Sequence, residues 1–263
     1  AALRKKHRTA EIVWLTSEKH ASLVRASFAD DVCDFEPVGA IPWDWVAEEE
    51  FTHVFHPEPP SSTDELQAKY VHPMDYMAQK CGVPLESRKP WLEPGKAALL
   101  EAESFLARFG LRRKRYLTIY HTGEVRRTWP SHTLHKLAAT TGLPVVVIGD
   151  AGEFATAGTV PCFGQSPRVI AALIRWSSFY IGPDSGVSWI ASTTSTPMGI
   201  FSDSRKNMQS HLSFVEIFTG EKDDVIEWTS QATTESIVEH IASRIQTPST
   251  PTDQGRPSGI SLG

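Results

Sequence analysis

Between residues 116 and 201 the sequence alternates short, strongly apolar stretches with segments of helical spacing. The stretches expected as strands are residues 116–120, 144–148, 179–181 and 198–201, and the expected helices are residues 131–141, 167–176 and 186–194. Strands and helices alternate in this way in βαβ units, where helices connect and cover parallel strands. The pattern predicts an α/β fold with a parallel sheet whose strands are buried on both faces.

The first part of the chain has a weaker pattern. It predicts helices at residues 1–6, 20–27, 73–81 and 95–109, and strands at residues 11–15, 31–35 and 52–55. A helix of a parallel α/β fold normally connects two strands. We therefore expect a strand and its following loop to precede residue 1.

A basic run, Arg112-Arg113-Lys114-Arg115, separates the two patterns and marks the expected domain joint. The chain is long enough for one large or two ordinary domains. We expect an incomplete N-terminal domain over residues 1–112, a C-terminal domain over residues 113–246, and a disordered tail rich in Pro, Ser, Thr and Gly over residues 247–263. The basic run either is simply solvated or touches an anionic acceptor.

Composition and charge exclude several classes of protein. A formal charge of −5 argues against a protein that coats nucleic acid, because such domains carry a basic excess. The three cysteines show no CxxC spacing and indicate reduced, buried thiols. No apolar run approaches the ~20 residues of a membrane helix, and no secretory signal is visible, so the sequence predicts a cytoplasmic protein without an integral membrane segment.

The most informative segment is Gly182-Pro183-Asp184-Ser185-Gly186, in which a buried strand ends in a tight turn and a helix begins. Unpaired backbone N–H groups at such a helix start can bind an anion at the carboxyl edge of the sheet. Ser185 could add a hydroxyl donor, and Gly186 would let the backbone approach a phosphate closely. The alternative is that Asp184 or Ser185 merely caps the helix.

Two further loops follow predicted strands. Arg126 and Arg127, just before Trp129-Pro130, can pair with a diphosphate through their guanidinium groups, unless the loop is only solvated. The segment 148–153, which includes Glu153, is another turn from strand to helix. Because all three loops follow strands of one expected parallel sheet, they should converge on one edge.

These motifs resemble the C-terminal half of the heptosyltransferase-like family, glycosyltransferase family nine, which has the two-domain GT-B architecture. Weaker similarity covers most of the chain and reaches back to residues 3–15. The resemblance implies an α/β fold with two Rossmann-like domains and parallel sheets. The matching motifs are Arg126-Arg127-Thr128-Trp129-Pro130, Gly164-Gln165-Ser166, Gly182-Pro183-Asp184-Ser185-Gly186 and Thr196-Pro197-Met198-Gly199-Ile200-Phe201.

The resemblance also implies roles for single residues. It places Glu153 at the nucleoside and Trp189, which stands where the family usually has histidine, at the donor sugar. It implies no catalytic residue in this chain, because the family's aspartate-bearing Gly-Asp loop would precede Ala1. The residues implied at the donor's phosphates and at the adjoining sugar are Thr122, Arg126, Arg127, Asp184, Ser185 and Gly186.

By resemblance, the implied reaction is inverting transfer of a heptose-like sugar from ADP-heptose or a similar nucleotide diphosphate-sugar. The acceptor would be a lipopolysaccharide-type glycan or another glycan or lipid-linked glycan, which would bring a cytoplasmic protein to the inner face of the membrane. No metal or cofactor is expected, since the histidines show no HExxH spacing. The rivals are a non-catalytic nucleotide-sugar- or glycan-binding relative and a sugar-nucleotide epimerase.

Overall fold

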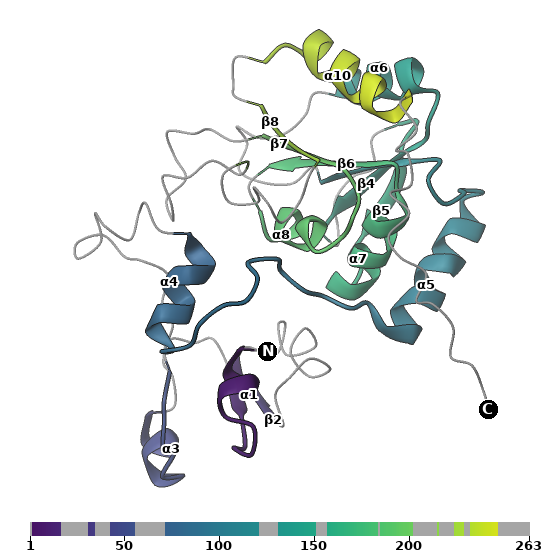
Figure 1. Ribbon diagram of the computed structural model, residues 1–263. Helices are drawn as coiled ribbons and strands as arrows, with labels where there is room; N and C mark the ends of the chain where they lie inside the picture. Colours follow the sequence, from purple (N-terminus) through teal and green to yellow (C-terminus); the bar gives the residue numbers. More distant parts are fainter. Residues whose placement is uncertain are drawn as a thin grey trace, which may run out of the picture.

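The structure is a computed structural model, and it describes residues 2–16, 31–34, 43–55, 72–120, 131–150, 157–183, 185–201, 215, 224–228 and 232–246 (Figure 1). The helices are α1 (Ala2–Lys6), α3 (Trp43–Glu48), α4 (Pro73–Lys80), α5 (Gly95–Arg108), α6 (Ser131–Thr141), α7 (Pro167–Trp176), α8 (Gly186–Ser192) and α10 (Thr234–Gln246). The strands are β1 (Val13–Thr16), β2 (Asp31–Asp34), β3 (Leu117–Tyr120), β4 (Val145–Gly149), β5 (Val160–Phe163), β6 (Phe179–Pro183), β7 (Met198–Phe201) and β8 (Val225–Trp228).

Six strands form one parallel sheet in the order β5-β4-β3-β6-β7-β8. Counted along the chain, its first strand (β3) lies in the middle and pairs with both its second (β4) and its fourth (β6). This is the doubly wound order of Rossmann-like folds, in which the chain changes direction across the sheet at one switch point. The predicted α/β fold with a parallel sheet is confirmed.

Alternate residues of the central strands face opposite layers of helices, as the period of a strand requires. Val146 and Ile148 of β4 pack into the cluster with α5, α7 and α8. Val145 and Val147 pack into the opposite cluster with α6 and α10. Figure 1 shows these two helix layers on either side of the sheet.

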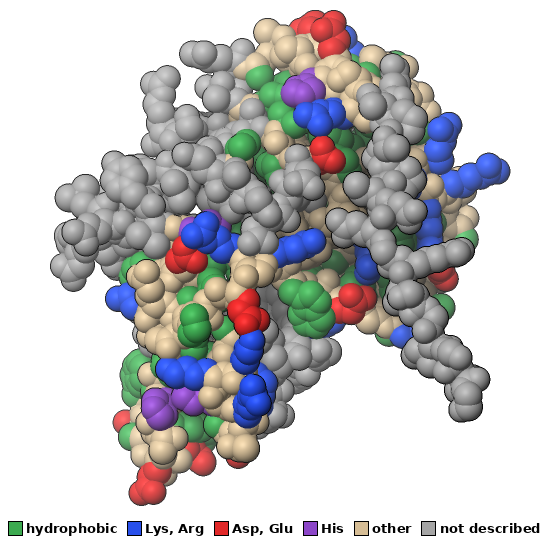
Figure 2. All heavy atoms as spheres, in the orientation of Figure 1, with side chains coloured by type: hydrophobic (Ala, Val, Ile, Leu, Met, Phe, Trp, Pro, Cys, Tyr) green, Lys and Arg blue, Asp and Glu red, His purple; other side chains and the backbone are tan. Residues whose placement is uncertain are grey.

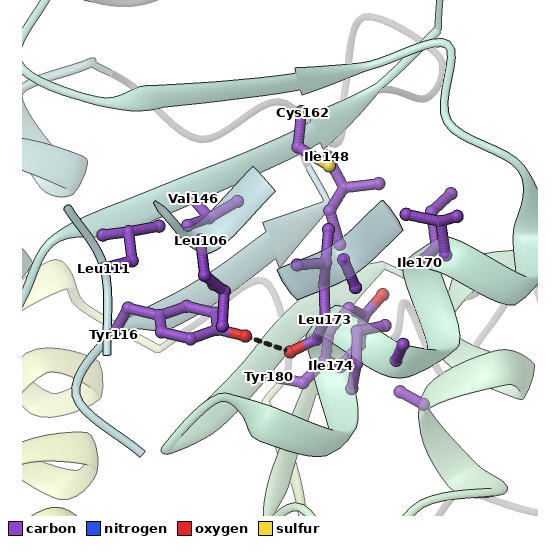
Figure 3. Packing of buried hydrophobic residues seen from close by; sticks show 14 of the residues in the cluster. Leu106, Leu111, Tyr116, Val146, Ile148, Cys162, Ile170, Leu173, Ile174 and Tyr180 are labelled. Carbon is purple, nitrogen blue, oxygen red and sulfur yellow. Dashed lines mark hydrogen bonds between the residues drawn. The ribbon is translucent and has the colours of Figure 1, made fainter. Parts of the chain in front are cut away.

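The α5 and α7 layer is locked to the sheet by a buried hydrogen bond as well as by apolar packing. The Tyr116 hydroxyl donates to the Leu173 carbonyl at 2.6 Å, from the start of β3 to α7 (Figure 3). Around this bond lie Leu106 of α5 and Ile174 of α7, both buried. Each such large side chain stabilises the fold by roughly 1.5–3 kcal/mol through burial.

Helix α5 belongs to this C-terminal core, although it precedes the expected joint at residues 112–115. Its buried face, Ala98, Ala102 and Leu106, packs in the same cluster as β4 and α7. We therefore propose that the domain boundary lies before α5, in residues 82–94, called the connecting segment below. Figure 1 shows this segment passing from α4 to α5.

The basic run is built into the C-terminal domain. The Lys114 ammonium donates to the carbonyls of Arg175 and Ser177, each at 2.9 Å, where α7 ends. The Arg113 guanidinium lies 3.8 Å from the ring centre of Trp176 and pairs with Glu103. A cation at a helix C-terminus complements the helix dipole, so these two residues have structural partners.

The N-terminal part contains a parallel pair of strands, β1 and β2, in the register Val13 with Asp31. The strand predicted at residues 52–55 is wrong, because that segment is irregular. Its rings pack instead: His53 lies 5.5 Å from His7 and 6.2 Å from Phe55, between ring centres. Figure 2 shows acidic and basic side chains interspersed on this part of the molecule.

Candidate functional site

The site predicted from sequence falls at the switch point of the large sheet. Strand β3 ends at Tyr120 and the neighbouring β6 ends at Pro183, with Ile119 paired to Ile181. The connections from these two strands run to α6 and α8, on opposite faces of the sheet. In open α/β folds, ligands bind in the crevice between two such diverging connections.

The sequence motifs follow, along the chain, strands that end at this edge. Residues 121–130 continue the chain from β3, and residues 184–186 continue it from β6. Of the predicted site residues, Ser185, Gly186 and Trp189 lie in the described part of the chain. The others, Thr122, Arg126, Arg127, Glu153 and Asp184, lie outside the described residues.

Ser185 caps the helix that follows β6. Its backbone is extended, and its Oγ accepts a hydrogen bond from the Ser188 amide at 3.3 Å. The capping alternative is therefore confirmed for Ser185. The Ser185 Oγ also lies 3.4 Å from the Ser188 Oγ, whose own proton is donated to the Pro183 carbonyl. Ser185 would therefore have to turn its proton away from Ser188 to make the predicted contact with a phosphate.

Gly186 begins α8 and is not required by the packing. A Cβ built at this position would meet nothing within 4 Å. A glycine in the first turn of a helix costs backbone entropy relative to alanine. The open space therefore fits the predicted close approach of a ligand to the backbone better than a need of the fold.

A buried hydroxyl network, not predicted from sequence, supports this turn. The Ser188 Oγ lies 2.9 Å from the Tyr180 hydroxyl and donates to the Pro183 carbonyl at 2.5 Å. Burial raises the pKa of Tyr180, so its hydroxyl stays protonated. The only hint in the sequence is the serine three residues after Ser185, where an N-cap residue finds its partner. The network holds the end of β6 and the start of α8 in one geometry.

Gly182 is constrained by the same network. A Cβ at this position would collide with the Tyr180 hydroxyl and would lie 3.2 Å from the Ser188 Oγ. Residue 182 must therefore be glycine, because the Tyr180 hydroxyl occupies the space that a side chain would need. The motif contains one glycine that packing requires and one, Gly186, that packing does not.

Trp189, the candidate contact for the donor sugar, lies one turn into α8, where its amide donates to the Ser185 carbonyl at 3.2 Å. Its side chain is half-buried and packs against the core cluster of α5 and α7. The indole is therefore at least partly a packing residue. The remaining exposed part leaves the sugar contact as a prediction.

Within the described part of the chain, no group of three or more His, Cys, Asp or Glu side chains could hold a metal ion. No helix among the described residues is both long and apolar enough to span a membrane.

The sequence matches no protein-family model and no curated protein. Solved structures do match. The glycosyltransferase of family 9 from Veillonella parvula superposes with a TM-score of 0.71 at 15% identity, over 93% of this chain and 90% of that chain. The ADP-heptose LPS heptosyltransferase II of E. coli gives 0.57 at 11% identity, over 93% and 92%. The E. coli heptosyltransferase WaaC, solved with ADP, gives 0.55 at 11% identity, over 92% and 93%.

These matches define a GT-B-like α/β fold that extends over nearly the whole chain. More particularly, the fold is that of the solved family-nine glycosyltransferase and of the two heptosyltransferases. The resemblance indicated by the motifs is thereby confirmed at the level of the fold.

Proposed function

We propose that this protein is a glycosyltransferase that binds a nucleotide diphosphate-sugar at the carboxyl edge of its six-stranded sheet. The observation that carries the proposal is the pairing of β3 with β6, the two strands that the motif segments follow in the sequence, although Tyr120 and Pro183, where these strands end, lie far apart along the chain. This is the edge at which ligands of doubly wound sheets bind. The solved relatives with the same fold are sugar transferases.

The donor would be ADP-heptose or a related sugar nucleotide, because one neighbour is solved with ADP and the same enzyme is also solved with an ADP-fluoroheptose. In the proposed arrangement Thr122, Arg126 and Arg127 bind the phosphates. Asp184, Ser185 and Gly186 line the phosphate and sugar end, and Glu153 holds the nucleoside. Guanidinium groups suit this task because their paired N–H donors match phosphate oxygens.

The proposed reaction is transfer with inversion and without a metal. A carboxylate base takes the proton of the acceptor hydroxyl, whose oxygen attacks the anomeric carbon. The bond from that carbon to the diphosphate breaks, and the diphosphate leaves with the electron pair toward Arg127 and the turn at Ser185. A lipopolysaccharide-type or other lipid-linked glycan would be met by a cytoplasmic protein at the inner face of the membrane.

The main rival is a binding protein with the same fold and no transferase activity, and a sugar-nucleotide epimerase is the second. The Trp129-Pro130 and Asp184-Ser185-Gly186 segments favour the transferase over the epimerase.

The test is incubation of the full chain with a panel of nucleotide diphosphate-sugars and candidate glycans, followed by mass spectrometry. A glycan heavier by one sugar, with release of nucleoside diphosphate, supports the transferase. Donor binding without any product supports the binding protein, and conversion of the donor to an isomer supports the epimerase.

A further inference from the structure

A cavity of about 500 Å³ lies between the connecting segment and the ends of α7 and α8. The segment contributes residues 87 and 89–94, α7 contributes Ala171 and Arg175, and the residues that follow α8 contribute Thr193, Thr194 and Ser195. Its volume is within the range of sites for small molecules, roughly 300–1,000 Å³. It does not overlap the predicted donor site.

The cavity lies at the opposite edge of the sheet from the donor site. Arg175 stands just before β6, and Ser195 stands just before β7. The amino ends of parallel strands share one edge, and the loops with the donor motifs follow the carboxyl ends. Strands of four or five residues separate the two edges by roughly 13–17 Å at about 3.3 Å per residue.

The outer wall of the cavity is held in place at both ends. The Arg88 guanidinium donates to both oxygens of Asp75 in α4, at 3.2 and 2.6 Å. At the other end, the Glu93 carboxylate accepts from Arg175 at 3.5 Å, and the Glu93 carbonyl accepts from Arg168. The cavity is therefore a built feature between two anchored points.

Three side chains of different chemistry line the cavity without a partner in the described part of the chain. They are the Lys89 ammonium, the Trp91 indole and the Ser195 hydroxyl. Trp91 is 65% exposed, so most of its indole surface is accessible to a ligand. The neighbouring Thr193 hydroxyl donates to the Ile190 carbonyl at 2.7 Å and keeps its lone pairs for a ligand.

This combination suits one class of ligand. An indole offers an apolar face to the C–H face of a sugar ring, and its N–H can bond a hydroxyl. Serine and threonine hydroxyls exchange hydrogen bonds with sugar hydroxyls. Among the described residues that line the cavity, Lys89 and Arg175 are positive and Glu93 is negative, so this lining has one positive charge in excess. A lysine ammonium and a guanidinium both bind carboxylate or phosphate oxygens.

We propose that this cavity is a second site that binds an acidic saccharide, with the sugar ring on Trp91 and its acidic group at Lys89 and Arg175. The site is independent of the donor site at the other edge of the sheet. It would hold a glycan chain on the C-terminal domain whether or not the donor is bound.

The test is calorimetric titration of the full chain with digalacturonic acid at pH 7, in the absence and the presence of saturating ADP. Maltose serves as the neutral disaccharide. Lys89→Gln and Trp91→Ala should each weaken digalacturonate binding about tenfold or more, because each removes one of the main contacts. The matched controls are Lys96→Gln on the exposed face of α5 and Trp43→Ala on α3, both of which should bind as the unaltered chain does.

The proposal predicts that ADP leaves digalacturonate binding unchanged and that maltose binds at least tenfold more weakly. Equal binding by all four variants, or competition by ADP, would overturn it. Binding to vesicles of phosphatidylglycerol without binding to digalacturonate would overturn it too, by assigning the basic groups to a lipid surface. These outcomes do not depend on transferase activity, so failure here and failure of the proposed function are distinguishable.

Discussion

At the scale of single residues, the two glycines of the turn after β6 should respond oppositely to alanine. At Gly182 the new methyl group collides with the Tyr180 hydroxyl, so Gly182→Ala should lower the free energy of unfolding by about 1–3 kcal/mol. At Gly186 the space is open, so Gly186→Ala should leave stability unchanged or raise it by up to ~1 kcal/mol. Urea unfolding measures both.

The same Gly186→Ala variant tests the site, because its methyl group would stand where the proposed phosphate approaches the backbone. We expect ADP binding to weaken about tenfold while the fold is kept. If ADP binds equally well, the ligand does not approach the chain at Gly186.

The packing at Gly182 can be checked with the double variant Tyr180→Phe, Gly182→Ala. Its loss of unfolding free energy should be smaller than the sum of the losses of the two single variants, because the hydroxyl that collides with the new methyl group is absent.

A further prediction at this scale concerns pH. Burial raises the pKa of the Cys162 thiol from 9.0 to about 12. Between these values the unfolded chain loses the proton and the folded protein keeps it, so stability falls as pH rises above 9 by roughly 1.4 kcal/mol per pH unit. Cys162→Ala should remove this part of the slope when unfolding is followed between pH 8 and pH 10.5. Equal slopes for the two proteins would mean that the thiol titrates alike in both states.

At the scale of elements, Lys114 connects the basic run to the carboxyl end of α7 through two hydrogen bonds. Replacing it by methionine keeps most of the aliphatic stem and removes the bonds to the Arg175 and Ser177 carbonyls. We expect Lys114→Met to cost about 1–3 kcal/mol of stability. Lys96→Met on the exposed face of α5 should cost almost nothing. A stable Lys114→Met protein with impaired glycan binding would instead support the acceptor role that the sequence left open.

The central elements could be predicted because their sequences contain strong local signals. The β-branched run of β4 and the capped, proline-started helix α7 are examples. The edge strands β5 and β8 were not predicted: β5 contains Pro161, which is tolerated only where a strand needs few backbone donors. The strand predicted at residues 52–55 is wrong, because the His53 ring packs between His7 and Phe55 in an irregular segment.

The candidate site was predictable in parts. A loop that follows a strand can be read from local sequence, and Ser185 has the residue type of an N-cap. Which two loops lie side by side cannot be read locally, since it depends on β3 pairing with β6 across the sheet. The Tyr180 network was missed for the same reason, because hydrogen bonding between buried hydroxyls depends on how a strand and a helix pack together.

At the scale of the whole molecule, the two edges of one sheet have different proposed tasks. The carboxyl edge is proposed to bind the donor, and the amino edge carries the cavity beneath the connecting segment.

Because α5 packs with the C-terminal core, a fragment that tests the donor domain alone should begin before Gly95. We expect such a fragment to unfold cooperatively and to bind ADP. A fragment that begins near Arg115 lacks Ala98, Ala102 and Leu106 and should be far less stable.

Calorimetric titration of the full chain with ADP, compared between Arg127→Ala and Arg112→Ala, tests most directly whether the donor binds at the carboxyl edge of the sheet. The two arginines stand on opposite sides of β3 in the sequence, one after its carboxyl end and one before its amino end. We expect Arg127→Ala to weaken ADP binding tenfold or more with little change in melting temperature, since it removes a charge-assisted contact to phosphate. Arg112→Ala should bind as the unaltered chain does. Undiminished ADP binding by Arg127→Ala, or an equal loss in both variants, would contradict the placement of the donor at the carboxyl edge.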